Sequence, residues 1–230
     1  MNFEVIEEPS PQSGEANMRI DSELLDSVSQ SGDTAFVRIY RWQEPTISLG
    51  YFQKDDDVSA LDARWQDCPV VKRLTGGGAI LHDQELTYSI ALPASHPFRH
   101  EPVSAYEQVH QAIIDLLTRL GAPCAMRGEA INVPRDDEPF LCFLRGDPRD
   151  VVIGPNKIIG SAQRRRRGAI LQHGSILLRS SALLSEVPGL ADLYPEQWTS
   201  VTETSFQTQL GSTICASIQA HDAADRPAEK

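Results

Sequence analysis

A cysteine and a lysine are the residues whose types and spacing most directly suggest chemistry. Cys142 lies in the apolar stretch PFLCFLR, and Lys157 opens a second apolar stretch, KIIGSAQ, 15 residues later. A thiol becomes a nucleophile when a nearby cation stabilises its thiolate form. A desolvated lysine can serve as an acid, a base or a cation that polarises a carbonyl group. The two residues therefore predict a nucleophilic site, provided that one sheet brings their side chains together.

Each of these two residues also has a simpler interpretation. A cysteine with apolar neighbours is commonly a small buried hydrophobic residue, and a lysine at the end of a strand is commonly exposed. The other cysteines are Cys68, Cys124 and Cys215, and no two of the four form a CxxC pair. We therefore expect reduced thiols and neither a disulfide framework nor a zinc site.

Three consecutive glycines, Gly76–Gly78, form a second candidate site. The polar residues around them are Lys72, Arg73, Thr75, His82 and Asp83. Glycine amides beside cationic side chains can hold an anion or a polarised carbonyl group. The alternative is a tight β-turn with incidental charges nearby.

A histidine in a third apolar stretch is open to two interpretations. His173 either orients a substrate or is a core histidine whose hydrogen bonds are satisfied. A Ser/His/Asp triad is conceivable from Ser161 or Ser175 with His173 and Asp83. Neither serine lies in a GxSxG elbow, so the signal for a triad is weak. The chain also contains no Walker A motif and no GxGxxG motif.

The elements that must position these residues are mostly short strands. Alternating and apolar runs, separated by turn residues, predict strands at 3–6, 35–40, 46–51, 69–74, 79–83, 86–92, 150–153, 157–162 and 168–178. Helical spacing of apolar residues predicts helices at 16–29, 58–66, 103–120 and 203–220. Helices and strands do not alternate regularly, which favours an α+β fold with a mixed, largely antiparallel sheet and flanking helices. We expect one domain over 1–220 and a disordered tail over 221–230.

Composition limits the classes of function. The 230 residues carry a net charge of −11, which argues against nucleic acid as a partner. A local exception is the run Arg164–Arg167, which is either a solvated loop or a site for an acidic protein or a phosphate. No apolar run has the ~18 residues of a membrane span, and the N-terminus does not resemble a signal peptide. We therefore expect a cytoplasmic protein without a membrane partner.

Several segments, taken in order, resemble the lipoate–protein ligase A / biotin–lipoate ligase family. They are NMRID at 17–21, RWQEPTISLGY at 41–51, KRLTGGGAILHD at 72–83, ELTYS at 85–89, KIIGSAQ at 157–163 and LQHGSIL at 171–177. The resemblance implies the sheet fold of the family's catalytic domain. It implies a glycine loop along the tunnel for an acyl chain and a lysine, here Lys157, at the activated acyl carbonyl. The implied acceptor is a lipoyl domain or a glycine-cleavage H protein.

The family uses two chemistries. Ligases activate free lipoate with ATP and Mg, whereas one octanoyltransferase branch needs no cofactor and moves octanoate through a cysteine thioester. Cys142-Phe143 matches that branch in its spacing to Lys157, and implied donors are an acyl carrier protein or an octanoylated H protein. Residues 144–151 do not match the expected aromatic segment, and their arginines are open to adenylate or phosphate binding, as in a ligase. A non-catalytic module that binds lipoyl domains is a third interpretation.

The resemblance also implies a set of site residues. Cys142 and Lys157 would be catalytic, and no metal site is expected. The substrate-binding residues would be Arg73, Thr75, Gly76, Gly77, Gly78, His82, Gly160, Ser161, Ala162, His173 and Gly174.

Overall fold

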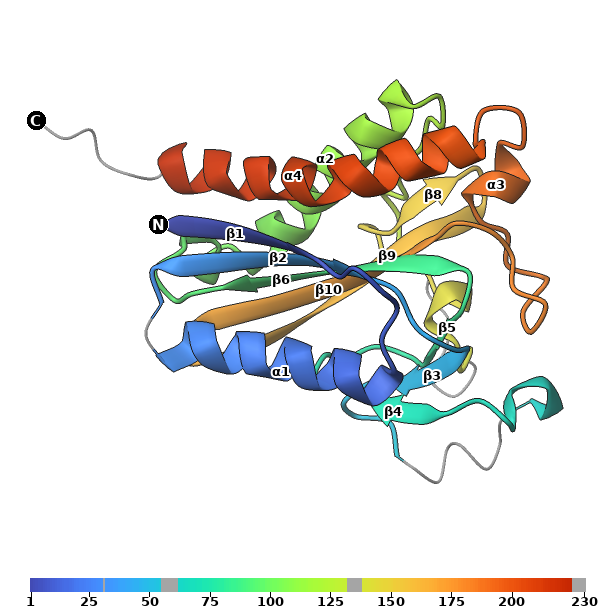
Figure 1. Cartoon of the computed structure of the whole chain (residues 1–230), viewed down its shortest axis with the longest axis horizontal. Helices are drawn as coiled ribbons and strands as arrows, with labels where there is room; N and C mark the ends of the chain where they lie inside the picture. The colour runs from blue at the N-terminus through green and yellow to red at the C-terminus, as the bar shows by residue number, and fades with distance from the viewer. Residues whose placement is uncertain (31, 55–61, 132–137, 225–230) are drawn as a thin grey trace, which may run out of the picture.

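The chain folds around one large sheet and one small sheet (Figure 1). The structure, a computed structural model, describes residues 1–30, 32–54, 62–131 and 138–224. The large sheet has the strand order β1-β2-β6-β10-β9-β8-β7, and the small sheet has the order β4-β3-β5. The strands are β1 (Asn2–Glu7), β2 (Thr34–Tyr40), β3 (Thr46–Leu49), β4 (Val70–Lys72), β5 (Ile80–His82), β6 (Glu85–Leu92), β7 (Ala125–Met126), β8 (Val151–Ile153), β9 (Asn156–Arg166) and β10 (Ala169–Leu177).

Both sheets are mixed. Strands β1 and β2 run parallel, as do β3 and β4, and every other pair of neighbouring strands is antiparallel. The predicted α+β class with a mixed, largely antiparallel sheet and flanking helices is therefore confirmed. The strands predicted at the glycine loop, the lysine and the histidine are also present.

Helices cover the two faces of the large sheet differently. Figure 1 shows α2 (Pro102–Arg119) and α4 (Ser200–Ala224) on one face and α1 (Gly14–Gln30) on the other. Side chains alternate between the two faces along a strand. Val37 of β2 and Ile90 of β6 point toward α2 and α4 and belong to the main hydrophobic core. The intervening Arg38 and Ser89 face α1 and make polar contacts there. The face at α2 and α4 is therefore apolar, whereas the face at α1 combines buried polar residues with a small apolar cluster. The small sheet lies on the same side as α1 (Figure 1).

The C-terminal helix is longer than predicted. Helix α4 continues through 221–224, which we expected to belong to a disordered tail, and 225–230 lie outside the described residues. His221 holds this extension because its ring stacks on Phe98 at 4.1 Å and bonds to Gln108 at 2.7 Å. The polar composition of 221–230 predicts disorder because it does not reveal contacts with residues far away in the sequence.

Smaller elements differ from the prediction as well. Of the helix expected at 58–66, the described residues form only the 3₁₀ turn η2 (Ala63–Trp65), and 58–61 lie outside them. Four short elements were not predicted: β7, the 3₁₀ turns η3 (Pro97–Arg99) and η5 (Cys142–Leu144), and α3 (Leu190–Leu193). Each has four residues or fewer, so no periodic pattern announces it.

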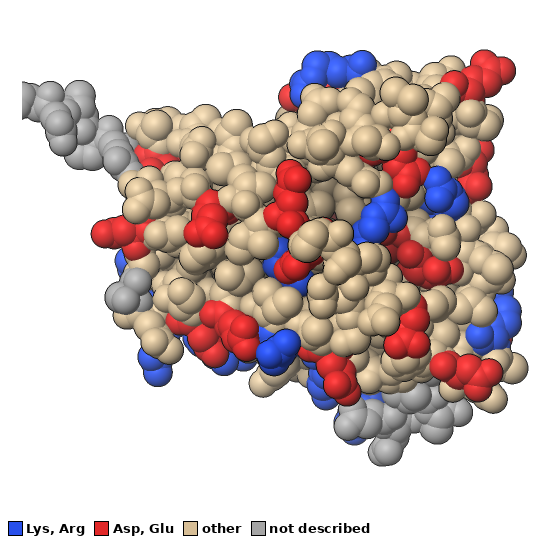
Figure 2. Space-filling view, in the orientation of Figure 1, with Lys and Arg blue, Asp and Glu red and all other residues tan. Residues whose placement is uncertain are grey.

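The surface and the helices add two observations. Figure 2 shows acidic and basic side chains interspersed over one face, where the basic side chains of the described residues form no continuous patch. Among the helices that the structure describes, none combines the length and apolar character that crossing a membrane requires.

Candidate active site

The glycine loop and Cys142 lie side by side because their flanking residues pair. The amide of Cys142 donates to the carbonyl of Ala79 at 2.7 Å, and the amide of Ala79 donates to the carbonyl of Phe140 at 3.0 Å. This parallel bridge joins the segment after Gly78 to the segment before the 3₁₀ turn η5. Two apolar stretches far apart in the sequence therefore place the thiol beside the glycines.

Lys157 reaches the thiol from β9. Its Nζ lies 3.8 Å from Cys142 Sγ and 3.1 Å from the carbonyl oxygen of Cys142. The residue is 6% exposed, so the amine is desolvated as the sequence prediction required. An ammonium in this position stabilises negative charge on the sulfur or on an oxygen bound next to it.

The sequence prediction missed the counter-ion of Lys157. Asp150 Oδ1 lies 3.0 Å from Nζ, and its other oxygen accepts a hydrogen bond from the amide of Asp147 at 2.8 Å. Burial raises the pKa of the Asp150 carboxyl, although the charge of Lys157 opposes that effect. Gly160 makes room for the lysine, because a Cβ there would come 2.6 Å from Lys157 Cε. The lack of a side chain at Gly160 therefore leaves the space that the Lys157 side chain occupies.

Arg73 holds the glycine loop from the inside. Its guanidinium is 1% exposed and donates to the carbonyl oxygens of Gly76 at 2.8 Å, of Gly78 and of Ser48 at 2.8 Å. Burial lowers the pKa of Arg73 to about 10, while the nearby Cys142 opposes this effect. The loop carbonyls therefore turn toward Arg73, which makes this residue a support of the loop.

Gly77 sits closest to the thiol. Its φ of 92° is a conformation that L side chains rarely adopt, and a Cβ there would lie 3.9 Å from Cys142 Sγ. Within the described part of the chain, the amides of Gly77 and Gly78 donate no hydrogen bond. Free amides beside a nucleophile are suited to stabilise an oxyanion.

A pocket of about 270 Å³ opens on these groups. It brings together five of the predicted site residues, which are Gly77, Gly78, Cys142, Lys157 and Ser161. Its remaining lining residues are Tyr106, His110, Glu138, Arg145, Gly146, Asp147, Arg149 and Asp150. The segment that departs from the family pattern thus forms much of the rim, where Arg145 pairs with Glu138 and Arg149 pairs with Asp147, each at 2.7 Å.

His110 of α2 is a second pocket residue that sequence analysis missed. Its Nδ1 lies 2.6 Å from the carbonyl oxygen of Arg149, so Nδ1 carries the proton and donates it there. Its Nε2 then accepts from Ser161 Oγ at 2.9 Å and Tyr88 Oη at 3.1 Å. Burial lowers the pKa of His110 to about 4, so the ring is neutral near pH 7. Its position beside Val109, on the apolar stripe of the predicted helix, was the available signal.

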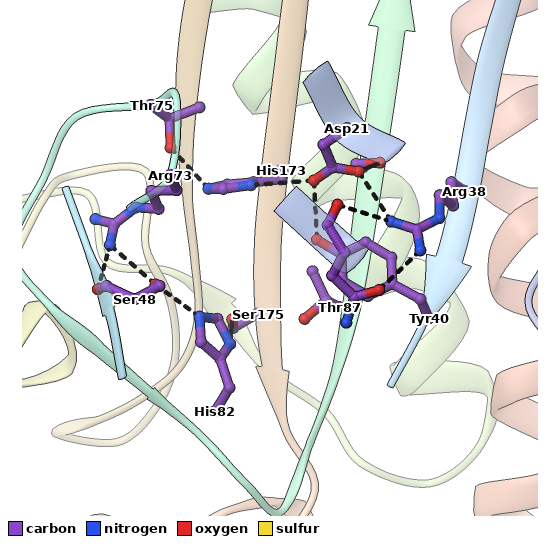
Figure 3. Close-up of polar contacts among 12 residues, drawn as sticks. Asp21, Arg38, Tyr40, Ser48, Arg73, Thr75, His82, Thr87, His173 and Ser175 are labelled. Carbon is purple, nitrogen blue, oxygen red and sulfur yellow. Dashed lines mark hydrogen bonds and ion pairs between the residues drawn. The ribbon is translucent and has the colours of Figure 1, made fainter. Parts of the chain in front are cut away.

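Thr75 and His173 meet in a buried polar network on the α1 side of the sheet (Figure 3). Thr75 Oγ1 lies 2.7 Å from His173 Nε2, and His173 Nδ1 lies 3.6 Å from Asp21 Oδ2. Burial raises the pKa of Asp21, but hydrogen bonds and charges from His173 and Arg38 outweigh this effect and leave it lowered. The network ties the start of the glycine loop to α1. His173 is buried, and its Nε2 is hydrogen-bonded to Thr75 Oγ1.

His82 belongs to a separate buried cluster. Its Nε2 lies 2.8 Å from Ser48 Oγ (Figure 3). Its Nδ1 lies 3.1 Å from Glu85, and its ring stacks on Trp42 at 3.8 Å. Burial lowers the pKa of His82. His82 is not among the residues that line the pocket, and its partner Ser48 Oγ also accepts a hydrogen bond from Arg73 at 3.1 Å.

The conceivable Ser/His/Asp triad is wrong. Ser175 approaches His82 at 3.5 Å, Ser161 bonds to His110, and Asp83 accepts from Ser181 at 2.7 Å. Of the two remaining predicted site residues, Ala162 pairs with His173 across β9 and β10, and Gly174 packs against the ring of Tyr88.

Comparison with known proteins agrees with this geometry. Residues 13–205 match the family model "Lipoyl protein ligase A/B catalytic domain". The chain is 38% identical over 172 residues to the octanoyltransferase LipM of Macrococcus caseolyticus, covering 70% of this chain and 60% of that protein. It is 39% identical over 173 residues to LipM of Geobacillus kaustophilus, with the same coverage. The chain therefore spans about 60% of the length of these relatives.

Solved structures show the same fold. A putative lipoate protein ligase of T. acidophilum, Ta0514, superposes with a TM-score of 0.67 at 21% identity, over 97% of this chain and 94% of that one. A lipoate-protein ligase A bound with ATP superposes with a TM-score of 0.62 at 22% identity, over 95% and 86%. At these identities the likeness concerns the fold.

Proposed function

Because the chain belongs to the lipoyl protein ligase A/B catalytic domain family, we propose that it is a protein acyltransferase. It moves an octanoyl or lipoyl group from a carrier onto a lysine of a lipoyl domain or a glycine-cleavage H protein. The observation that carries this proposal is the 3.8 Å contact between Lys157 Nζ and Cys142 Sγ inside the pocket. The names of the LipM relatives support octanoyl as the transferred group.

The chemistry has two halves. The Cys142 thiolate attacks the carbonyl carbon of a donor thioester, the new C–S bond forms, and the donor thiolate leaves and takes up a proton. The acceptor lysine then attacks the Cys142 thioester as a neutral amine. An amide bond forms, the thiolate of Cys142 is regenerated, and the amine proton passes to water. Each half passes through a tetrahedral oxyanion, which Lys157 and the amides of Gly77 and Gly78 are placed to stabilise.

This scheme needs neither ATP nor a metal, because the donor arrives already activated as a thioester. The alternative is a ligase that forms an acyl-adenylate with ATP and Mg, as the ATP-bound relative of this fold suggests. The arginines considered for a phosphate, Arg145 and Arg149, are each paired with a carboxylate at the pocket rim. That pairing leaves less positive charge for a triphosphate and favours the transferase.

One set of incubations tests the proposal. The chain is mixed with octanoyl carrier protein and an apo acceptor, with and without ATP, and the acceptor mass is followed. We expect transfer without ATP and a trapped octanoyl adduct on Cys142. Cys142→Ala should abolish transfer, whereas Cys124→Ala, which removes a thiol outside the pocket, should retain it. Full transfer by Cys142→Ala, or activity only with free octanoate and ATP, would favour the ligase.

A further inference from the structure

Two aromatic residues stand exposed directly after β3. Phe52 is 82% exposed and Tyr51 is 41% exposed, and their rings meet edge to face at 5.1 Å. A large apolar side chain that is mostly in water contributes little to folding. Exposed aromatic residues of this kind are enriched at protein–protein contacts, where their burial supplies much of the binding energy.

This pair lies against the wall of the candidate active site. The amide of Tyr51 donates to the carbonyl of Thr75 at 2.8 Å, and a Cβ on Gly76 would touch the ring of Phe52 at 4.0 Å. The next residue, Gly77, faces Cys142 Sγ. The glycine loop is therefore a thin wall with the aromatic pair on one side and the thiol on the other.

An arginine adds a positive charge to the same surface. The guanidinium of Arg164 lies 4.4 Å above the ring of Tyr51. Eight other arginines pair with carboxylates, namely Arg19, Arg38, Arg41, Arg64, Arg145, Arg149, Arg166 and Arg179. Arg164 makes no ion pair with any residue that the structure describes. No carboxylate among the described residues neutralises its charge, which suits it to bind a carboxylate of a partner.

We propose that Tyr51, Phe52 and Arg164 form the docking surface for the protein that presents the acceptor lysine. The proposal rests on the proposed function and deepens it. A lysine carries its amine on a four-carbon stem, so the acceptor backbone must approach within that length of Cys142 Sγ. A partner this close lies next to the glycine loop, where Phe52 borders Gly76. The partner that fits has an apolar contact for Phe52 and a carboxylate near its lysine for Arg164.

The experiment separates docking from chemistry. Wild type, Phe52→Ser and Arg164→Gln are compared in three assays with purified chains. The first is acylation of Cys142 by octanoyl-N-acetylcysteamine, which has no carrier protein. The second is discharge of the acyl-enzyme to hydroxylamine, and the third is transfer to a purified apo lipoyl domain. Val201→Ser, at a site 77% exposed on α4, and Arg119→Gln, at the exposed end of α2, are the matched controls.

We expect the first two assays to be unchanged in both variants. Transfer to the lipoyl domain should fall about tenfold in kcat/KM for Phe52→Ser, mainly through KM. For wild type, KM should rise with salt, and Arg164→Gln should flatten that dependence. Unchanged kcat/KM in both variants would overturn the docking surface, as would an equal loss with hydroxylamine. Failure of wild type to acylate Cys142 would instead contradict the proposed function itself.

Discussion

Lys157 and Asp150 form a buried ion pair, with 3.0 Å between Nζ and Oδ1 and at most 6% exposure of either residue. The same ammonium lies 3.8 Å from Cys142 Sγ. A buried charge is costly unless an opposite charge pairs with it, and Asp150 supplies that charge inside the pocket. Asp150 therefore balances the charge of Lys157 and does so without contacting the Cys142 thiol itself.

Asp150→Asn should lower both activity and stability. Without the carboxylate 3.0 Å away, the Lys157 ammonium is no longer held beside Cys142 Sγ, so single-turnover acylation of Cys142 should slow. Breaking a buried pair also costs about 3–5 kcal/mol in unfolding free energy. Asp150→Glu, which restores the charge, should recover part of the acylation rate. A lower melting temperature with an unchanged acylation rate would make Asp150 merely structural.

Lys157→Arg should lose most of its activity despite keeping the positive charge. The guanidinium is planar and larger than an ammonium, so it cannot occupy the point between Asp150, the sulfur and the acyl oxygen. Loss of one such stabilising group costs about 3 kcal/mol in the transition state, or about a hundredfold in rate. Single-turnover acylation of Cys142 measures this effect directly. A rate near that of wild type would mean that charge alone suffices.

Gly160→Ala tests how the lysine is held. The added Cβ would come 2.6 Å from Lys157 Cε and 3.0 Å from Nζ, so the ammonium must move away from Asp150 and Cys142. We expect acylation to fall at least tenfold, with little change in the affinity for the acceptor. Gly154→Ala is a control elsewhere on the β8–β9 hairpin, where a Cβ would meet no atom within 4 Å but the φ of 56° strains the turn without touching Lys157. Equal effects of the two changes on rate and melting would indicate loss of hairpin stability alone.

The sequence predicted the centre of this site better than its surroundings. The residue types of Cys142 and Lys157 and their separation of 15 residues are visible in the sequence, and the strands around them show clear periodicity. The Asp150–Lys157 pair depends on the register of β8 and β9, which shifts between Val151 and Val152. Such a bulge adds one unpaired residue and re-aims side chains, and no pattern in 150–157 announces it. Asp150 was therefore read only as the first residue of a strand.

The roles of the predicted histidines and of Arg73 needed the tertiary structure for a similar reason. His82 and His173 lie in strands that the sequence predicts, but their partners Ser48 and Asp21 come from other elements. Arg73 lay next to the glycines in sequence, yet its guanidinium binds their carbonyl oxygens from inside the fold. Residue type and spacing identified these positions, whereas the direction of each side chain followed from packing.

Gly77→Val tests the predicted acyl tunnel along the glycine loop. The φ of 92° disfavours any side chain, and the new group would extend toward Arg73 and Cys142. An octanoyl chain gains about 0.8 kcal/mol per buried CH₂, so blocking its path should lower octanoyl transfer more than acetyl transfer. Comparing both donors corrects for strain in the loop. Equal losses would mean that Gly77 serves only the turn, and the acyl chain would then lie elsewhere.

Acidification should destabilise the fold through His110. Its folded pKa is about 4, lowered by burial, whereas an unfolded histidine titrates near 6.5. Between these values the unfolded chain binds one more proton than the native chain, so stability is lost as pH falls through that window. The loss amounts to about 1.4 kcal/mol for each unit of pKa difference. Burial also lowers the pKa of His82 and His96, which adds to the same trend.

Chemical unfolding of wild type and His110→Gln between pH 7.5 and 4 isolates the contribution of His110. The glutamine has no proton to gain in this window, so its stability should depend less steeply on pH than that of wild type. His221→Gln is the control, because His221 lies on α4 and is hydrogen-bonded to Gln108. Parallel curves for wild type and His110→Gln would show that the pKa of His110 is not lowered in the native state relative to the unfolded chain. The native ring would then gain a proton in this window, and its Nε2 could no longer accept from Ser161 at the pocket.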